Sequence, residues 1–273
     1  MSTEGDTLSA YALQDLFRCC PLLTVLKLKL YPGLLTNTIL QTLFESCHNL
    51  VEVEIYAEPL ATLTTTTTTA DLVDEPVLLA RYPTLTKLTV RGDGMTDSAL
   101  RDIFTYSNNL REVNLINYTH ITDDTIKVLS QSCCKLEALL LDSYITPQLT
   151  VDGLSYISTY CTNLTSLQLI HMSIDDEFLI QLSQHCINLK IIYLDHCGYT
   201  NTTNTADNAI PIKDSDPVTV RNPISETGIL AILDKCIRLK VFTISECNIT
   251  ITRTLHMIEQ GKLYPHVSFA IDE

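Results

Sequence analysis

Residues 161–186, CTNLTSLQLIHMSIDDEFLIQLSQHC, contain one complete structural unit of this chain. Apolar and polar residues alternate from Leu164 to Leu169, which predicts a short strand with one buried face. An acidic pair, Asp175 and Asp176, follows the strand, and the apolar residues of segment 178–182 then recur at helical spacing. One strand and one helix in about 26 residues predict a unit that buries its apolar face only by stacking on copies of itself.

The same unit recurs eight times along the chain. Each copy starts with a small residue or tyrosine, carries an apolar anchor three residues later, and has two more anchors in its strand. The first anchors are Leu23, Leu50, Leu85, Leu110, Leu136, Leu164, Leu189 and Leu239. An L-x-x-L-x-L pattern at this period predicts an α/β leucine-rich repeat solenoid, a curved horseshoe with a parallel β-sheet on its concave face and helices on its convex face.

The spacing of the copies predicts the organisation of the chain. Residues 1–18 are expected to form a partial repeat that caps the array, 19–261 the repeat domain, and 262–273 a capping strand. Two anchor-to-anchor steps are long, and their extra residues, 57–76 and 198–223, are rich in Thr, Asn and Asp. We interpret both as loops inserted after a strand. A further copy within the second is the alternative, because that step is twice the usual length.

Short polar residues stand where each helix should begin. Thr96, Thr122, Asp175 and Ser225 each follow an apolar residue and precede an acid. A side-chain oxygen at this position accepts a hydrogen bond from a free helix N–H, and an acid favours the positive helix end. We therefore predict that these four residues are N-caps, and that the repeated acidic pairs are structural and not catalytic.

Six of the ten cysteines, Cys20, Cys47, Cys133, Cys161, Cys186 and Cys236, occupy the same position at the end of a helix. A small apolar thiol suits a crowded inner position and can donate weakly to a turn carbonyl. We predict buried structural thiols there, and exposed thiols at the neighbouring Cys19 and Cys134. No C-x-x-C pair occurs, so neither a metal site nor any other cofactor is expected.

Composition limits the classes of function. The net charge of −14 argues against nucleic acid and anionic membranes as partners and mildly favours basic proteins. The sequence offers no G-x-S-x-G, H-E-x-x-H or phosphate-binding glycine loop, so no enzyme is predicted. No apolar window reaches the length of a membrane span and the N-terminus has no signal-peptide pattern, so we expect a cytoplasmic or nuclear monomer.

The concave face is the candidate binding surface. Residues between and just after the strand anchors point into the concavity. In the central and C-terminal copies several of them are apolar or aromatic on a surface that could have been polar, and acids surround them. Such a combination is typical of protein-binding surfaces. The predicted partner-binding residues are Ile116, Leu140, Asp142, Ile170, His171, Tyr193, Asp195 and His196.

The pattern C-x-x-L-x-x-L-x-L-x-x-C followed by an I-T-D-like turn resembles the cysteine-containing leucine-rich repeats of F-box proteins, within the ribonuclease-inhibitor-like superfamily. The copies that start at Cys133, Cys161, Cys186 and Cys236 carry the resemblance best. In that family the repeats form a curved solenoid that selects the substrate of a cullin-based, SCF-type ubiquitin ligase. The F-box segment that precedes the repeats there is not expected in this chain.

The resemblance implies a non-catalytic recognition module, the substrate-selecting part of an SCF-type ligase or of a relative, with a protein substrate and a cullin-ligase adaptor as partners. A free-standing repeat scaffold or a cell-cycle regulator outside any ligase is the alternative. Regulation of a small GTPase is a third class, but the repeat proteins that do this resemble a longer unit with Asn at the turn.

Overall fold

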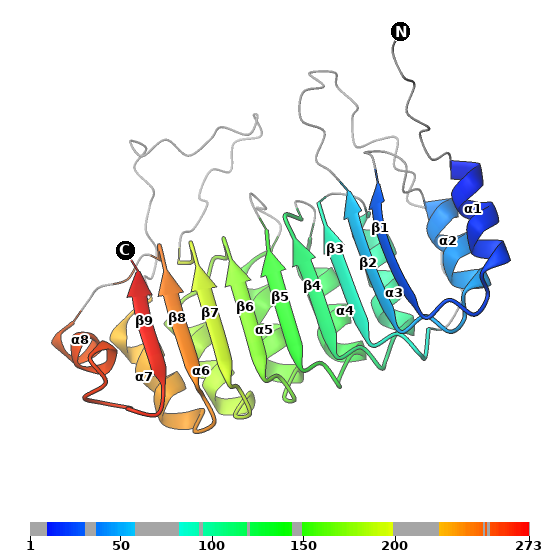
Figure 1. Cartoon of the computed structure of the whole chain (residues 1–273). Helices are drawn as coiled ribbons and strands as arrows, with labels where there is room; N and C mark the ends of the chain where they lie inside the picture. The colour runs from blue at the N-terminus through cyan, green and yellow to red at the C-terminus, as the bar shows by residue number, and fades with distance from the viewer. Residues whose placement is uncertain are drawn as a thin grey trace, which may run out of the picture.

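A nine-stranded, all-parallel sheet runs the length of the molecule, with its strands in chain order (Figure 1). The computed structural model describes residues 10–30, 37–57, 82–92, 95–118, 121–143, 149–198, 224–247, 249 and 252–272. The strands are β1 (Val25–Leu30), β2 (Glu52–Ala57), β3 (Lys87–Arg91), β4 (Glu112–Ile116), β5 (Ala138–Asp142), β6 (Ser166–Ile170), β7 (Ile191–Asp195), β8 (Val241–Ser245) and β9 (Ser268–Asp272).

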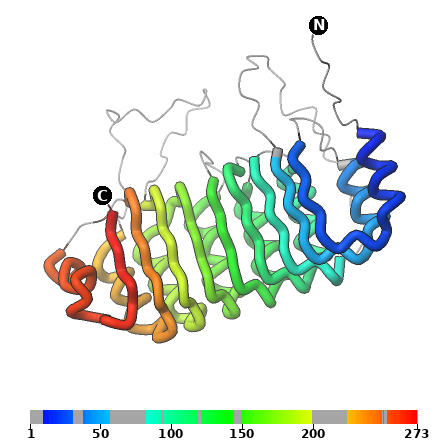
Figure 2. The backbone as a smooth tube through the Cα atoms, in the orientation of Figure 1, coloured from blue at the N-terminus to red at the C-terminus, as the bar shows by residue number. Residues whose placement is uncertain are grey.

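Among the described residues the helices alternate with the strands except between β2 and β3, and they lie behind one face of the sheet, while the opposite face forms the inside of a shallow curve (Figures 1 and 2). This confirms the predicted leucine-rich repeat solenoid. The helices are α1 (Ala10–Cys19), α2 (Asn37–Ser46), α3 (Asp97–Tyr106), α4 (Asp123–Ser132), α5 (Val151–Tyr160), α6 (Asp176–His185), α7 (Glu226–Lys235) and α8 (Arg253–Glu259).

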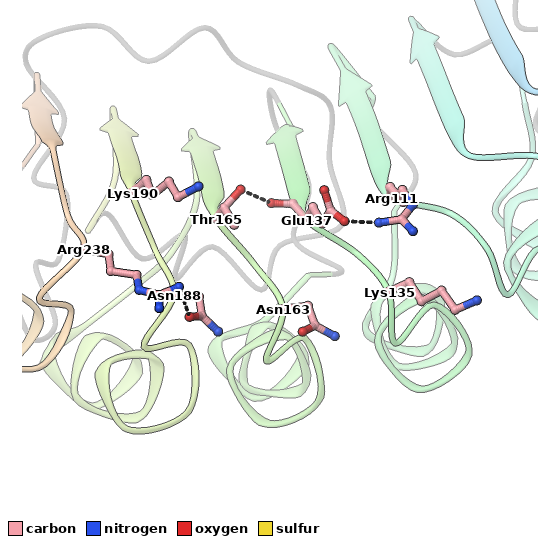
Figure 3. Close-up of a pocket in the computed structure, with 8 residues that line it drawn as sticks. All are labelled: Arg111, Lys135, Glu137, Asn163, Thr165, Asn188, Lys190 and Arg238. Atoms are coloured by element: carbon pink, nitrogen blue, oxygen red, sulfur yellow. Dashed lines mark hydrogen bonds and ion pairs between the residues drawn. The ribbon is translucent and has the colours of Figure 1, made fainter.

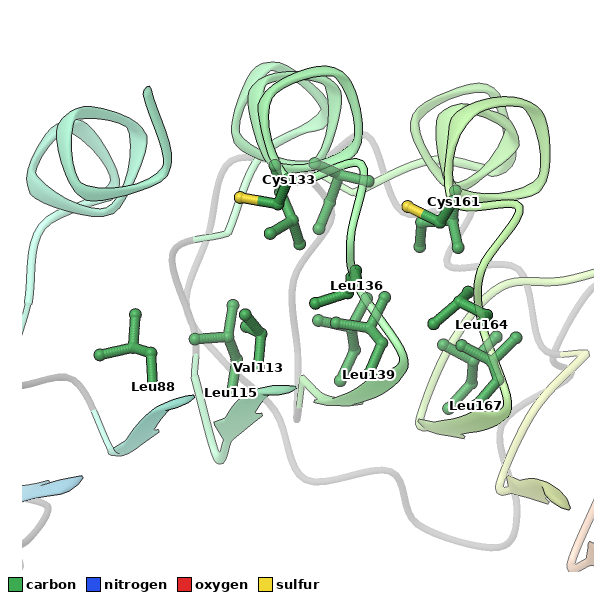
Figure 4. Packing of buried hydrophobic residues seen from close by; sticks show 14 of the residues in the cluster. Leu88, Val113, Leu115, Cys133, Leu136, Leu139, Cys161, Leu164 and Leu167 are labelled. Carbon is green, nitrogen blue, oxygen red and sulfur yellow. The ribbon is translucent and has the colours of Figure 1, made fainter. Parts of the chain in front are cut away.

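Leucine anchors fill the space between the sheet and the helices (Figure 4). In β4, β5 and β6 every second residue is buried, and the register places equivalent anchors side by side, as in Val113, Leu139 and Leu167. Because each copy buries its anchors only against its neighbours, the core is a ladder and not a single centre. The anchors Leu23 and Leu28 are only half-buried, since β1 has a neighbouring strand on one side alone.

All four predicted N-caps are confirmed. The side chains of Thr96, Thr122, Asp175 and Ser225 each accept a hydrogen bond from an N–H group of their helix. Thr150 caps α5 in the same way, although the sequence pattern did not single it out. The cap explains why each helix begins directly after the strand turn.

The acid after the N-cap has a second role. Asp123 of α4 accepts from the backbone N–H and the hydroxyl of Thr150, both at 2.7 Å, and so caps the turn of the next copy. Asp176 does the same for Ser225, at 2.8 and 2.5 Å. The equivalent residue of α5 is Val151. Its next N-cap, Asp175, carries no hydroxyl to donate and would repel a carboxylate.

The cysteine ladder is confirmed at five of its six predicted positions, Cys47, Cys133, Cys161, Cys186 and Cys236, part of which Figure 4 shows. Cys20, in the first copy, is only half-buried. Cys186 lies with its Sγ 3.4 Å from the carbonyl oxygen of Cys161, and Cys47 and Cys133 contact the corresponding carbonyls of the copies before them. These thiols are buried, whereas Cys19 and Cys134 are exposed, as predicted. The S–H groups of Cys47, Cys133 and Cys186 therefore donate to a turn carbonyl of the preceding copy.

Ser107 occupies the cysteine position in its copy, and its hydroxyl is buried without a hydrogen-bond partner among the described residues. An unsatisfied buried hydroxyl destabilises the fold by about 1–3 kcal/mol. We therefore expect Ser107→Cys to raise the free energy of unfolding by about 1 kcal/mol, measured by urea unfolding in reductant. Ser183→Cys is the control, because the Ser183 hydroxyl donates to the Ile180 carbonyl at 2.7 Å. An equal gain in both variants would contradict the explanation.

The two ends of the array are covered differently. At the N-terminus α1 buries Leu13 and Phe17, but Tyr11 and Leu16 of the same predicted apolar run remain 80% and 47% exposed. At the C-terminus β9 pairs with β8, and α8 contacts β9. The expected inserted loops lie almost wholly outside the described residues, as does the alternative extra copy.

Candidate partner-binding face

The structure places all eight predicted binding residues at strand positions that alternate with the buried ones or directly after the strands. Each of them is half-buried, because alternate strand residues point away from the helices while their neighbours point into the core. Their positions agree with the sequence analysis. Their part in binding remains a prediction.

Most of the candidates gather at the carboxyl ends of β5, β6 and β7. Asp142, Ile170 and Asp195 lie side by side in register at the last position of their strands. Ile170 is therefore an apolar residue between two carboxylates. Leu140 lies one pleat earlier, separated from Tyr193 by Gln168. Such a mixture gives a partner both an apolar contact area and acidic groups around it.

The residue after the strand turns the chain through a left-handed conformation in several copies. His171, His196 and Glu246 have φ values of 58°, 51° and 45°, and Gly92 has 74° in the equivalent place of an earlier copy. Their N–H groups extend the sheet by one step, as in the 2.8 Å bond from His171 to the Asp195 carbonyl. Non-glycine residues adopt this conformation at a cost, and it is concentrated at functional sites.

This turn brings two imidazoles together. The rings of His171 and His196 lie 4.8 Å apart, centre to centre. His171 Nδ1 is 3.2 Å from Asp142 Oδ1, while His196 Nδ1 and Nε2 are each 2.8 Å from an oxygen of Asp195 and Glu246 respectively. Both nitrogens of His196 can donate only in the imidazolium form, in which each nitrogen carries a proton. The group therefore has three carboxylates for two imidazoles, which favours a cationic partner.

Tyr193 completes the cluster on the strand side. Its hydroxyl is 3.3 Å from Asp195 Oδ2. Burial, together with the negative charge of Asp195, raises the pKa of Tyr193 above its ordinary value, so the phenol stays protonated and can donate at neutral pH. An amphipathic aromatic ring held in place by a hydrogen bond is a common contact residue in protein interfaces.

Two points differ from the candidate set. Ile116 lies on β4, beside Arg91, two strands from β6, the strand that His171 follows. Glu246 contacts His196 directly but was absent from the predicted set. It could have been found, because it directly follows its strand, as His171 and His196 follow theirs.

Within the described ranges, no group of three or more His, Cys, Asp or Glu side chains is arranged to hold a metal ion. No helix among the described residues has both the length and the apolar character that crossing a membrane requires.

Comparison with known proteins gives similarity over about a third of the chain. No model of a known protein family matches the chain. A stretch of 100 residues, 35% of the chain, is 28% identical to F-box protein SKIP17 from Arabidopsis thaliana. A stretch of 114 residues, 39% of the chain, is 31% identical to Coronatine-insensitive protein homolog 1a from Oryza sativa subsp. indica and japonica. The matched stretches span only 21% and 19% of those proteins.

Among solved structures, the complex of Rad7 and Elc1 from yeast contains a chain that matches 96% of this chain and 76% of its own length. The TM-score is 0.39 and the sequence identity is 11%.

Proposed function

We propose that this protein is a non-catalytic recognition module that binds a partner protein through the carboxyl-terminal half of its concave face. The observation that carries the proposal is the arrangement around Ile170 and Tyr193, where apolar contact area, a histidine pair and three carboxylates share one surface. We infer that the partner presents a basic segment, because the face is acidic and the chain carries a net charge of −14.

The kind of partner follows from the similarity to F-box proteins, which covers about a third of the chain. Together with the cysteine-containing repeats, this similarity favours the substrate-selecting part of an SCF-type ubiquitin ligase or a relative of it, which would also contact a cullin-ligase adaptor. A free-standing repeat scaffold uses the same face without an adaptor, so adaptor recovery separates the two functions.

The test is affinity capture with a variant that removes the contact surface. We expect Tyr193→Ala combined with Ile170→Thr to abolish recovery of the partner from an extract of the native organism, because both changes remove apolar area from the centre of the face. Thermal unfolding should change little, since neither side chain is fully buried. An acidic replacement at Ile170 would be a poor choice, because it would place a third carboxylate between Asp142 and Asp195.

A matched control changes the same residue types away from the concave face. Tyr160 and Ile187 lie at helix ends and are 43% and 53% exposed, so Tyr160→Ala with Ile187→Thr should leave capture intact. Equal capture by both double variants would contradict the proposed face. If a partner is recovered in a way that depends on Tyr193 and Ile170 but without a cullin-ligase adaptor, that result would support the free-standing scaffold and contradict the ligase function.

A further inference from the structure

A second surface lies at the opposite edge of the sheet, where the strands begin (Figure 3). An open groove of about 470 Å³ runs there across several repeats. We call it the edge groove and define it by Arg111, Lys135, Asn163, Thr165, Lys190 and Arg238. It is separate from the concave cluster, which lies at the carboxyl ends of the strands.

The edge groove is basic on a strongly acidic chain. Four of its lining side chains are cationic and one, Glu137, is acidic, whereas the whole chain has a net charge of −14. Arg111 forms an ion pair with Glu137. The exposed ammonium group of Lys190 has no carboxylate partner in the described part of the chain. A local excess of positive charge in a concave surface attracts anionic groups.

Two further cations are held by neutral oxygens. The Lys135 ammonium donates to Asn109 Oδ1 at 2.5 Å, and Arg238 Nη1 donates to Asn188 Oδ1 at 3.2 Å. In both cases the amide belongs to the copy before, so the repeat itself positions the cation. An amide oxygen fixes the side chain without neutralising its charge. Lys135 and Arg238 therefore keep their full charge for a ligand.

The repeat register sets the spacing of the charges. Arg111, Glu137, Thr165 and Lys190 each directly follow the first leucine anchor of their copy. The backbone N–H of each of the last three donates at 2.8 Å to the carbonyl of the residue before it in this row. Since neighbouring strands lie about 4.8 Å apart, Arg111 and Lys190 are separated by about 14 Å, which is the length of about four residues of an extended chain.

We propose that the edge groove binds an extended acidic peptide segment of a partner protein, with carboxylate groups about four residues apart. One carboxylate pairs with Lys190 and Arg238, and the other pairs with Lys135 and Arg111. Asn163 and Thr165 supply polar side chains between these two pairs, where the peptide backbone passes.

The observations favour a peptide over a polynucleotide. A long polyanion would extend beyond the groove over a chain whose net charge of −14 repels it, whereas a short acidic segment contacts only the basic part. The cations are exposed, and their spacing follows the strands, which suits a ligand that runs along the edge of the sheet.

The test measures the fluorescence anisotropy of a fluorescein-labelled peptide of about 12 residues, in which two Glu residues lie about four positions apart. We expect saturable binding that weakens as NaCl rises, because ion pairs on an exposed surface are screened. Lys190→Glu with Arg238→Glu should weaken binding at least about tenfold, since two attractive charges become repulsive. The control double variant, Arg253→Glu with Lys262→Glu, makes the same change in net charge at exposed positions outside the groove and should weaken binding less than about twofold.

Three results would overturn the proposal. The first is absence of peptide binding by the unmodified protein. The second is equal weakening in both double variants, which would show a general effect of net charge. The third is competition by a single-stranded oligonucleotide that displaces the peptide at lower concentration than the unlabelled peptide does, which would make the groove a polynucleotide site. Circular dichroism of both variants verifies that the fold is retained.

Discussion

Replacing Tyr118 by alanine is expected to lower the free energy of unfolding by about 3–5 kcal/mol. Tyr118 is fully buried in the turn after β4 and is among the largest side chains of the core. Its hydroxyl donates to the Met95 carbonyl at 2.5 Å in the preceding turn, and its own carbonyl accepts from Ser143 at 2.9 Å in the next one. The residue therefore connects three consecutive copies. Alanine would leave a cavity and would deprive the Met95 carbonyl of its hydrogen-bond donor.

Thermal unfolding followed by circular dichroism measures this effect, with Tyr118→Phe as the control. Phenylalanine keeps the ring and removes only the hydrogen bond to Met95, so we expect a loss of about 1–3 kcal/mol. Because the copies contact only their neighbours, the alanine variant should also unfold less cooperatively, with the array weakened at its middle. Equal losses in the two variants would show that ring packing contributes little.

The fold could be predicted from the sequence because every copy repeats the same information. The first leucine of each copy, the cysteine at the helix end and the polar N-cap recur in register, so an error in one copy is corrected by the others. The contacts of Tyr118 could not be predicted in this way. Tyr118 stands three residues after a strand anchor, where Cys197 and Cys247 stand in later copies, and no pattern indicates that a phenol there reaches back to Met95.

The candidate face was predictable in position because strand residues alternate. Its geometry was not, because the contact between His171 and His196 depends on a left-handed residue after each strand. Only Gly92 and Asn117, which follow β3 and β4, are residue types that favour that conformation. The contact of His196 with Glu246 also joins two copies 50 residues apart, across a segment whose length no periodic pattern sets.

The edge groove was missed for a different reason. Its cations stand on either side of the first leucine anchor, at positions that vary from copy to copy: Lys135 and Arg238 precede their anchors, whereas Arg111 and Lys190 follow theirs. A single copy gives no signal, and the basic character emerges only when the strand register adds neighbouring copies together. Surfaces of solenoids are therefore best predicted by comparing equivalent positions along the array.

Alkaline pH is expected to destabilise the protein through its buried cysteines. Burial raises the pKa of Cys133 and Cys186 to about 12, from an ordinary value of 9. Ionisation would also remove the S–H groups that donate to the carbonyls of Ser107 and Cys161. The unfolded chain releases these protons near pH 9 and the folded chain only near pH 12. The stabilisation is therefore complete below about pH 9 and is lost as the pH rises toward 12.

The expected size follows from the shift in pKa. Each pKa unit corresponds to about 1.4 kcal/mol, so each thiol should contribute a loss on the order of 1 kcal/mol by pH 10 and about 4 kcal/mol by pH 12. Urea unfolding in reductant at pH 8, 9 and 10 measures the slope. The double variant Cys133→Ala with Cys186→Ala should start from a lower stability, because it creates cavities, but should lose less between pH 9 and 10. Tyrosines and lysines titrate equally in both proteins. If the free energy of unfolding fell equally with pH in both, these groups, and not Cys133 and Cys186, would make the solenoid sensitive to alkali.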